Sequence, residues 1–222
     1  MLGLPKTTEV NKRIPKQALH NNMQLTPMLK RVLTEQVDSI YWRNKIADDT
    51  MNLGKGNTVT EIQIFEIRLN SSNLNTELLR QIDKQVYYHV LFLLEYKGEY
   101  QAWIAHKEKA QTGDNAFKVH DYYHTDRLPE EQLMLKLDGM NLDTVYENYV
   151  RQLGGKALEA QKSGESLEHS IERDKKRQKL QREITVLEGK VRRERQFNKQ
   201  VELNSELKRL KRMMEAIYID AR

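Results

Sequence analysis

The sequence predicts an α+β fold: a body with a mixed sheet, a central β-hairpin and about three helices, followed by a long C-terminal coiled-coil helix. Two apolar and aromatic runs flank Lys97 and Gly98, which is typical of a β-hairpin. Elsewhere in the first 155 residues, apolar stripes at helical spacing alternate with β-branched runs. From Ser166 onward the chain has no Pro, and apolar residues recur at spacings of four and three. We therefore expect a body over residues 1–155, a linker over 156–165 and a basic coiled-coil tail over 166–222.

The body is expected to begin with an extended or irregular arm. Pro5 and Pro15 break this stretch, which runs to Leu25 and leaves room for a short helix near residues 16–20. Thr26 and Pro27 are typical of the N-cap and first position of a helix. The apolar stripe that follows predicts a helix to about residue 44.

The middle of the body carries the strongest strand signals. Residues 58–69 are rich in β-branched side chains and predict a strand, and Asn75 is a candidate cap for a second helix. Residues 88–96 and 99–106 form the predicted hairpin. Because residues 90–94 lack polar alternation, we expect their strand to be central and covered on both faces.

The last part of the body is expected to hold two further strands and a third helix. The strands are predicted over residues 117–123 and 133–137. Asn141 or Asp143 is a candidate cap for the helix, and Gly154 with Gly155 is expected to end it.

Two apolar seams in the tail are out of phase with each other, so the heptads break between about Glu194 and Val201. The absence of Gly and Pro at the break favours one continuous helix of 57 residues, roughly 85 Å long; the alternative is a helical hairpin. An exposed seam of this kind is expected to pair with itself or with a partner helix. The predicted partner-binding residues are Leu180, Ile184, Leu187, Val191, Leu203, Leu207, Leu210, Met214 and Ile217.

Composition excludes several classes of protein. Without Cys, the chain has no disulfide framework, no thiol chemistry and no Cys-ligated metal. The longest strictly apolar run is residues 90–94, far too short for a bilayer span, and the N-terminus lacks a secretory apolar region. We therefore expect a cytoplasmic protein that does not enter a membrane.

The net charge of +5 is unevenly distributed. From Ile171 onward there are 16 basic and 9 acidic residues, against 21 and 23 in the rest of the chain. Any attraction to a polyanion therefore belongs to the tail, although an ordinary solvated coiled-coil surface explains the same residues. The predicted nucleic-acid-binding residues are Lys175, Lys176, Arg177, Lys179, Arg182, Lys190, Arg192, Arg193 and Arg195.

One pattern in the body suggests catalysis. Glu95 and Lys97 at the end of an apolar strand, with Asp83 upstream, resemble the residues with which nucleases hold Mg²⁺ and orient water. The alternative is that Glu95 and Lys97 simply open a solvated turn. His120 and His124 lack a third ligand at a suitable spacing, so no metal and no cofactor is expected.

Five segments of the body resemble a known family. They read LPKTTEVNKRIPK (4–16), IYWRNK (40–45), EIQIFEI (61–67), YHVLFLLEY (88–96) and QAWI (101–104). They are similar to the uncharacterised prokaryotic family called domain of unknown function 4391, over about residues 2–220 and including a C-terminal coiled coil. The family has no assigned activity. Its members are typically encoded near helicases and DNA methyltransferases of restriction-like or phage-defence islands, which implies an accessory role there.

These observations lead us to expect a non-enzymatic accessory subunit of a DNA-targeting defence complex. Its expected partner is a helicase or DNA methyltransferase subunit, or a second copy joined through the coiled coil, with possible contact between the basic tail and DNA. Two alternatives stay open: a metal-dependent nuclease that uses Asp83, Glu95 and Lys97, and a stand-alone, sequence-independent nucleic-acid binder.

Overall fold

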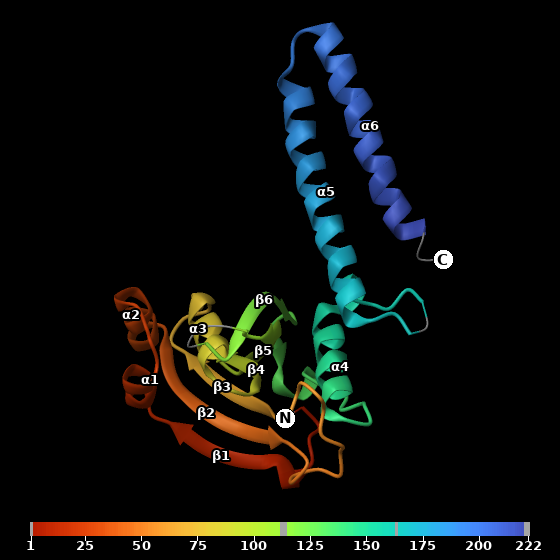
Figure 1. The fold of residues 1–222 in the computed structure, drawn as a ribbon. Helices are drawn as coiled ribbons and strands as arrows, with labels where there is room; N and C mark the ends of the chain where they lie inside the picture. Colours follow the sequence, from red (N-terminus) through yellow and green to blue (C-terminus); the bar gives the residue numbers. More distant parts are fainter. Residues whose placement is uncertain (1, 112–114, 163, 220–222) are drawn as a thin grey trace. The chain divides into compact units, whose positions relative to one another are not determined.

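The computed structural model describes residues 2–111, 115–162 and 164–219 of the chain. The chain divides into two compact units, residues 1–154 and residues 155–222, which are described separately below. The first is an α+β unit built on one sheet, and the second consists mainly of two long helices (Figure 1). In the described part of the chain, no helix combines the length and the apolarity that a membrane crossing requires.

The sheet of the first unit is mixed, and its six main strands lie in chain order. Every neighbouring pair is antiparallel except β3 and β4, which are parallel and joined by a crossover through a helix. A two-residue strand, β7 (Leu128–Pro129), pairs with β5. The six main strands are β1 (Glu9–Ile14), β2 (Val37–Ile46), β3 (Ile62–Leu69), β4 (His89–Tyr96), β5 (Glu99–Lys109) and β6 (Phe117–His124).

The predicted hairpin is confirmed as β4 and β5, in the interior of the sheet. Lys97 and Gly98 have φ angles of +55° and +84°, the left-handed conformation that both central residues of a type I′ hairpin turn adopt. Residues 90–94 are buried without interruption, as expected for a strand covered on both faces.

Among the residues of the first unit that the structure describes, four α-helices accompany the sheet, together with two short 3-10 turns, Lys6–Thr8 and Glu130–Gln132. The Thr26 hydroxyl accepts a hydrogen bond from the Leu29 amide at 3.3 Å, which confirms the predicted N-cap. Asn75 accepts from the Glu77 amide at 3.0 Å, and Asn141 accepts from the Thr144 amide at 3.0 Å. The helices are α1 (Lys16–Asn22), α2 (Pro27–Glu35), α3 (Glu77–Gln85) and α4 (Leu142–Gly154).

One face of the sheet packs against α2 and α3. Leu33 of α2 and Leu79 of α3 are fully buried in the same cluster as Ile67 of β3 and Phe92 of β4. The helical spacing of the apolar residues on each helix places them toward the sheet, so burial of this face accounts for both helices. This cluster fixes the position of α3 on the sheet, and α3 carries Asp83.

Two expectations for the body are wrong. The helix predicted to reach residue 44 ends at Glu35, because Val37, Ile40 and Tyr41 instead pair in β2 between β1 and β3. The expected extended arm is confirmed in part as the edge strand β1, and its short helix is confirmed as α1. Residues 133–137 form no strand; Leu133 and Leu135 are nevertheless buried.

The tail is not one continuous helix. Helix α5 (Leu167–Arg193) and helix α6 (Phe197–Ile219) lie side by side and run in opposite directions (Figure 1). Glu194 is extended at ψ 129°, and its carboxylate accepts hydrogen bonds from the amides of Arg195 and Gln196, both at 2.9 Å. On one straight helix the two seams would face different directions, whereas in a hairpin they face each other. The hairpin alternative is therefore the correct one, and its turn lies where the heptads break.

Candidate functional site

Asp83 on α3 and Lys107 on β5 form a buried ion pair in the first unit. The Lys107 ammonium lies 2.6 Å from the Asp83 carboxylate and donates to the carbonyl of Tyr88 at 2.9 Å. The Tyr122 hydroxyl of β6 donates to the other Asp83 oxygen at 2.5 Å. Lys107 also lies 4.3 Å from the centre of the Phe117 ring. The contacts therefore tie α3 to β5 and β6.

Burial sets the protonation states around this pair. Burial lowers the pKa of Lys107, and the Asp83 carboxylate opposes that shift. Burial, and then the Asp83 carboxylate, raises the pKa of Tyr122, so its hydroxyl stays a donor. Burial, and then the Lys107 charge, lowers the pKa of His89 to about 3. His89 is therefore neutral where its ring packs at 4.3 Å from the Tyr146 ring and 4.8 Å from the Phe117 ring.

The structure does not bring the three predicted nuclease residues together. The Asp83 carboxylate is paired with the Lys107 ammonium, which also donates to the carbonyl of Tyr88, the residue just before β4. Glu95 lies seven residues beyond Tyr88, roughly 23 Å along an extended strand. Its carboxylate accepts from the Gly98 amide at 2.8 Å, and Lys97 lies in the turn. Among the described residues, no three His, Cys, Asp or Glu side chains are placed to share a metal ion.

A second buried carboxylate, Glu66 on β3, was not anticipated from the sequence. Arg43 of β2 lies 2.6 Å from one of its oxygens and Arg68 lies 2.8 Å from the other. Both guanidinium groups also lie over the Tyr41 ring, at 5.2 and 4.9 Å from its centre. The sequence does contain a signal for this site: Glu66 is the one acidic residue in the mainly apolar strand IQIFEIRL. A carboxylate that is buried in such a strand needs a cationic partner.

In the second unit, the predicted seam residues contact one another within the same chain. Leu180, Ile184 and Leu210 form a buried cluster between α5 and α6. Leu187, Leu207, Met214 and Ile217 pack against it, and Leu203 and Val191 are half-buried. Lys211 reaches across the hairpin to Glu188 at 2.8 Å. The two helices therefore cover most of each other's apolar seam residues within the same chain.

The predicted basic residues remain at the surface of α5 and the turn. Eight of the nine are exposed, and only Arg177 is half-buried, 2.6 Å from Asp174. In the part of the chain that the structure describes, Lys176, Lys179, Lys190 and Arg193 make no ion pair. Their charges are therefore available to a ligand. The eight exposed residues are Lys175, Lys176, Lys179, Arg182, Lys190, Arg192, Arg193 and Arg195.

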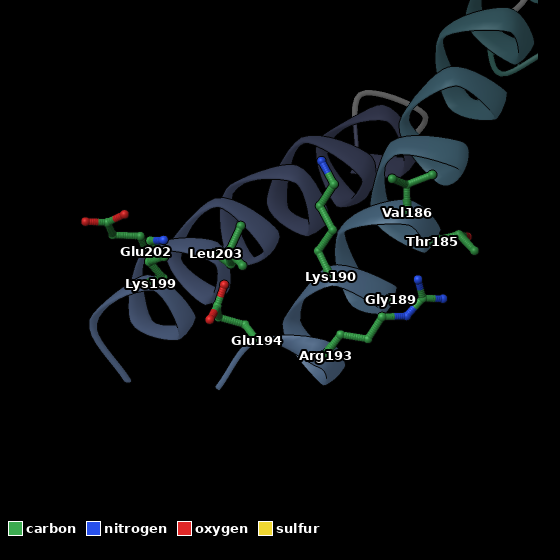
Figure 2. Close-up of a pocket in the computed structure, with 9 residues that line it drawn as sticks. All are labelled: Thr185, Val186, Gly189, Lys190, Arg193, Glu194, Lys199, Glu202 and Leu203. Atoms are coloured by element: carbon green, nitrogen blue, oxygen red, sulfur yellow. The ribbon is translucent and has the colours of Figure 1, made fainter. Parts of the chain in front are cut away.

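A hollow of about 810 Å³ opens between α5 and α6 near the turn (Figure 2). Val186, Lys190 and Arg193 of α5 line it, together with Leu203 of α6. A second hollow of about 470 Å³ lies farther from the turn, again lined by both helices. The hairpin thus presents both free positive charge and partly apolar recesses.

The model of a family described as a domain of unknown function (DUF4391) matches residues 2–214. Neither a curated protein nor a solved structure matches the chain.

Proposed function

The chain belongs to the DUF4391 family, and we propose that this member is a non-enzymatic accessory subunit of a DNA-targeting restriction-like or phage-defence complex that contacts DNA through α5. The observation that carries the proposal is the group of eight exposed basic side chains between Lys175 and Arg195. The resemblance to the family implies that the chain is encoded near helicases or DNA methyltransferases. That implication supports a restriction-like or phage-defence complex as the assembly that the chain joins.

The geometry of α5 suits a DNA backbone. Lys175 and Arg193 are 18 residues apart on one helix, roughly 27 Å at the standard rise per residue. Duplex DNA carries about one negative charge per 1.7 Å of its axis, so a helix of this length lies against many phosphates. Long basic side chains on a regular helix provide salt-dependent affinity without base recognition.

The body supports an accessory rather than a catalytic role. Asp83, the one predicted metal ligand that is buried, is already held by an ammonium and a phenol hydroxyl. Glu95 holds the backbone of its own turn. Neither carboxylate has the paired arrangement with which metal-dependent nucleases bind Mg²⁺.

Two variants of equal net charge test the DNA contact. Replacing Lys175, Arg182, Arg192 and Arg195 with Gln, and separately replacing Lys12, Arg13, Lys30 and Arg31 with Gln, each lowers the net charge from +5 by four. Binding of a fluorescent duplex is measured between about 50 and 200 mM salt. The slope of log affinity against log salt concentration changes by about 0.9 for each phosphate contact on duplex DNA. We expect the α5 variant, which lacks four basic side chains, to lower this salt slope by up to about 3.6, and the body variant to leave it unchanged. Equal effects of the two variants would mean that net charge alone governs binding.

The accessory role is tested by affinity purification of the tagged protein from its own host after nuclease treatment. We expect a helicase or DNA methyltransferase to co-purify at a fixed stoichiometry. Recovery of the protein by itself would contradict the accessory role and favour a stand-alone nucleic-acid binder. The salt titration would then be the test of that function.

A further inference from the structure

The two hollows of the hairpin follow one another along one side of α5, because Lys176, Glu183 and Lys190 among their lining residues recur every seven residues. The lining of both hollows together is called the groove below. The first hollow is lined on α5 by residues between 185 and 193, and the second by residues between 176 and 183. On α6 the order is reversed, with residues 199–203 at the first hollow and residues 209–217 at the second. This reversed order follows from the antiparallel arrangement of the two helices, so both helices line the groove at each of its ends.

The surface of the groove is partly apolar and open to solvent. Val186 of α5 is 60% exposed and Met213 of α6 is 44% exposed, although both are large apolar side chains. Gly189 also lines the groove, and a Cβ added there would meet no other atom within 4 Å. A glycine inside a helix costs about 1 kcal/mol relative to Ala, and no packing within this hairpin requires it. Its open side lets another backbone approach α5 closely.

The rim of the groove is positive. Its acidic residues are Glu183, Glu194 and Glu202, and the Glu194 carboxylate is held by backbone amides of the turn. Its basic residues are Lys176, Lys179, Lys190, Arg193, Lys199 and Arg209. An occupant that complements this groove presents an apolar stripe flanked by negative charge.

We propose that this groove binds an acidic, amphipathic helix of a partner protein, which packs on α5 and α6 as the third helix of a bundle. The lining residues of α5 from Lys176 to Arg193 span roughly 26 Å, so a helix of about 17 residues fills the groove. Duplex DNA does not complement the exposed Val186 and Met213, whereas an apolar stripe buries both. The inference deepens the proposed function by naming the chemistry of its protein partner.

The probe is a synthetic acidic peptide of 18 residues, with Leu at alternating spacings of three and four and Glu on both flanks. A second peptide keeps the Leu positions and carries Lys in place of Glu. Binding to the full chain is followed by fluorescence anisotropy. We expect the acidic peptide to bind at least tenfold more tightly than the basic one. Equal binding of both, or no binding of the acidic peptide, overturns the proposal.

Three single substitutions locate the binding site. Val186→Glu and Met213→Glu place a negative charge in the groove at exposed positions, and we expect each to weaken binding of the acidic peptide at least tenfold. Val201→Glu is the matched control: Val201 is an apolar residue of α6, 52% exposed, that lines neither hollow. We expect it to change binding less than twofold. If Val201→Glu weakens binding as much as the other two, the groove is not the site.

Two further outcomes would assign the groove to another occupant. If light scattering shows a dimer that Val186→Glu dissociates, the occupant is a second copy of the chain. If Val186→Glu lowers affinity for duplex DNA as much as it does for the peptide, DNA lies in the groove. The α5 variant that lacks Lys175, Arg182, Arg192 and Arg195 separates the two proposals, because none of these residues lines either hollow. If the α5 variant loses DNA binding but still binds the acidic peptide, the result supports both the DNA contact and the peptide site in the groove. If the α5 variant still binds DNA, the proposed DNA contact is wrong and the peptide site is unaffected.

Discussion

At the scale of single residues, the body fully buries the carboxylates of Asp83 and Glu66 and neutralises each differently. Asp83 contacts one ammonium and one phenol hydroxyl, whereas Glu66 contacts two guanidinium groups. Removing one partner of a buried ion pair leaves an uncompensated charge, which is far more costly than never having formed the pair. A change of one polar group at either contact is therefore expected to be costly.

Asp83→Asn is expected to destabilise the protein by about 3–5 kcal/mol, because it leaves the Lys107 ammonium buried without its carboxylate. Urea unfolding of the full chain measures the loss. Combining it with Lys107→Met removes both charges and is expected to recover part of the stability.

Asp49→Asn is the control for that substitution. The Asp49 carboxylate lies 2.7 Å from the Lys45 ammonium, close to the 2.6 Å of the Asp83–Lys107 pair, but the Asp49 side chain is 60% exposed. A much smaller loss is expected there, because solvent screens such pairs. A loss at Asp83 no larger than the loss at Asp49 would show that the buried pair is not a main support of the body.

His89 predicts an acid sensitivity. The pKa of its imidazole is lowered from 6.5 to about 3, so between those values the unfolded chain binds a proton that the folded chain does not. Stability is therefore lost as pH falls below about 6.5, by about 1.4 kcal/mol per pH unit where the difference is one proton. We expect His89→Phe to remove that part of the slope in urea unfolding measured between pH 6 and 4. An unchanged slope would mean that His89 becomes protonated in the folded protein.

The buried pairs also show what the sequence could not predict at the residue scale. Asp83 was identified as a chemically important carboxylate, but its expected partners were Glu95 and Lys97 rather than Lys107 and Tyr122. Lys107 lies in β5 and Tyr122 in β6, so the cluster depends on how the strands and α3 are arranged. Periodicity along the chain holds no information about that arrangement.

At the scale of elements, the strongest local signals predicted the right structures. The β4–β5 hairpin, α3 and α4 follow from turn chemistry, caps and apolar spacing. The helix predicted beyond Glu35 failed because residues 37–46 satisfy helical spacing and strand propensity equally well, and pairing with two neighbouring strands decided the outcome. In the tail, the phase break was visible in the sequence, but its interpretation as a continuous helix was wrong.

The hairpin makes a specific cross-linking prediction. Glu188 and Lys211 form an ion pair at 2.8 Å between α5 and α6, and the chain has no native Cys. A variant with both residues replaced by Cys, treated with a short bismaleimide, is expected to give a cross-linked monomer in mass spectrometry. Phe197→Cys with Glu188→Cys serves as a control for random reaction. A covalent dimer as the main product would indicate that α5 pairs with α6 of another copy.

At the scale of the whole molecule, the net charge of +5 hides a division between the units. Residues 155–222 hold 18 basic and 12 acidic side chains, and residues 1–154 hold 19 and 20. The first unit is therefore nearly neutral and the second is strongly positive. Salt screens charges beyond about 8 Å at physiological ionic strength, so a polyanion responds to the charges near it and not to the sum over the chain.

This division predicts that adding positive charge to the body does not improve DNA binding. Replacing the exposed residues Glu35, Glu99, Asp126 and Glu131 with neutral amides raises the net charge from +5 by four. At about 150 mM salt we expect the affinity for a DNA duplex to change less than about threefold, because these positions lie outside the basic group on α5. A gain of tenfold or more, or a steeper salt slope, would show that DNA contacts the first unit as well, and the proposed interface would then have to include it.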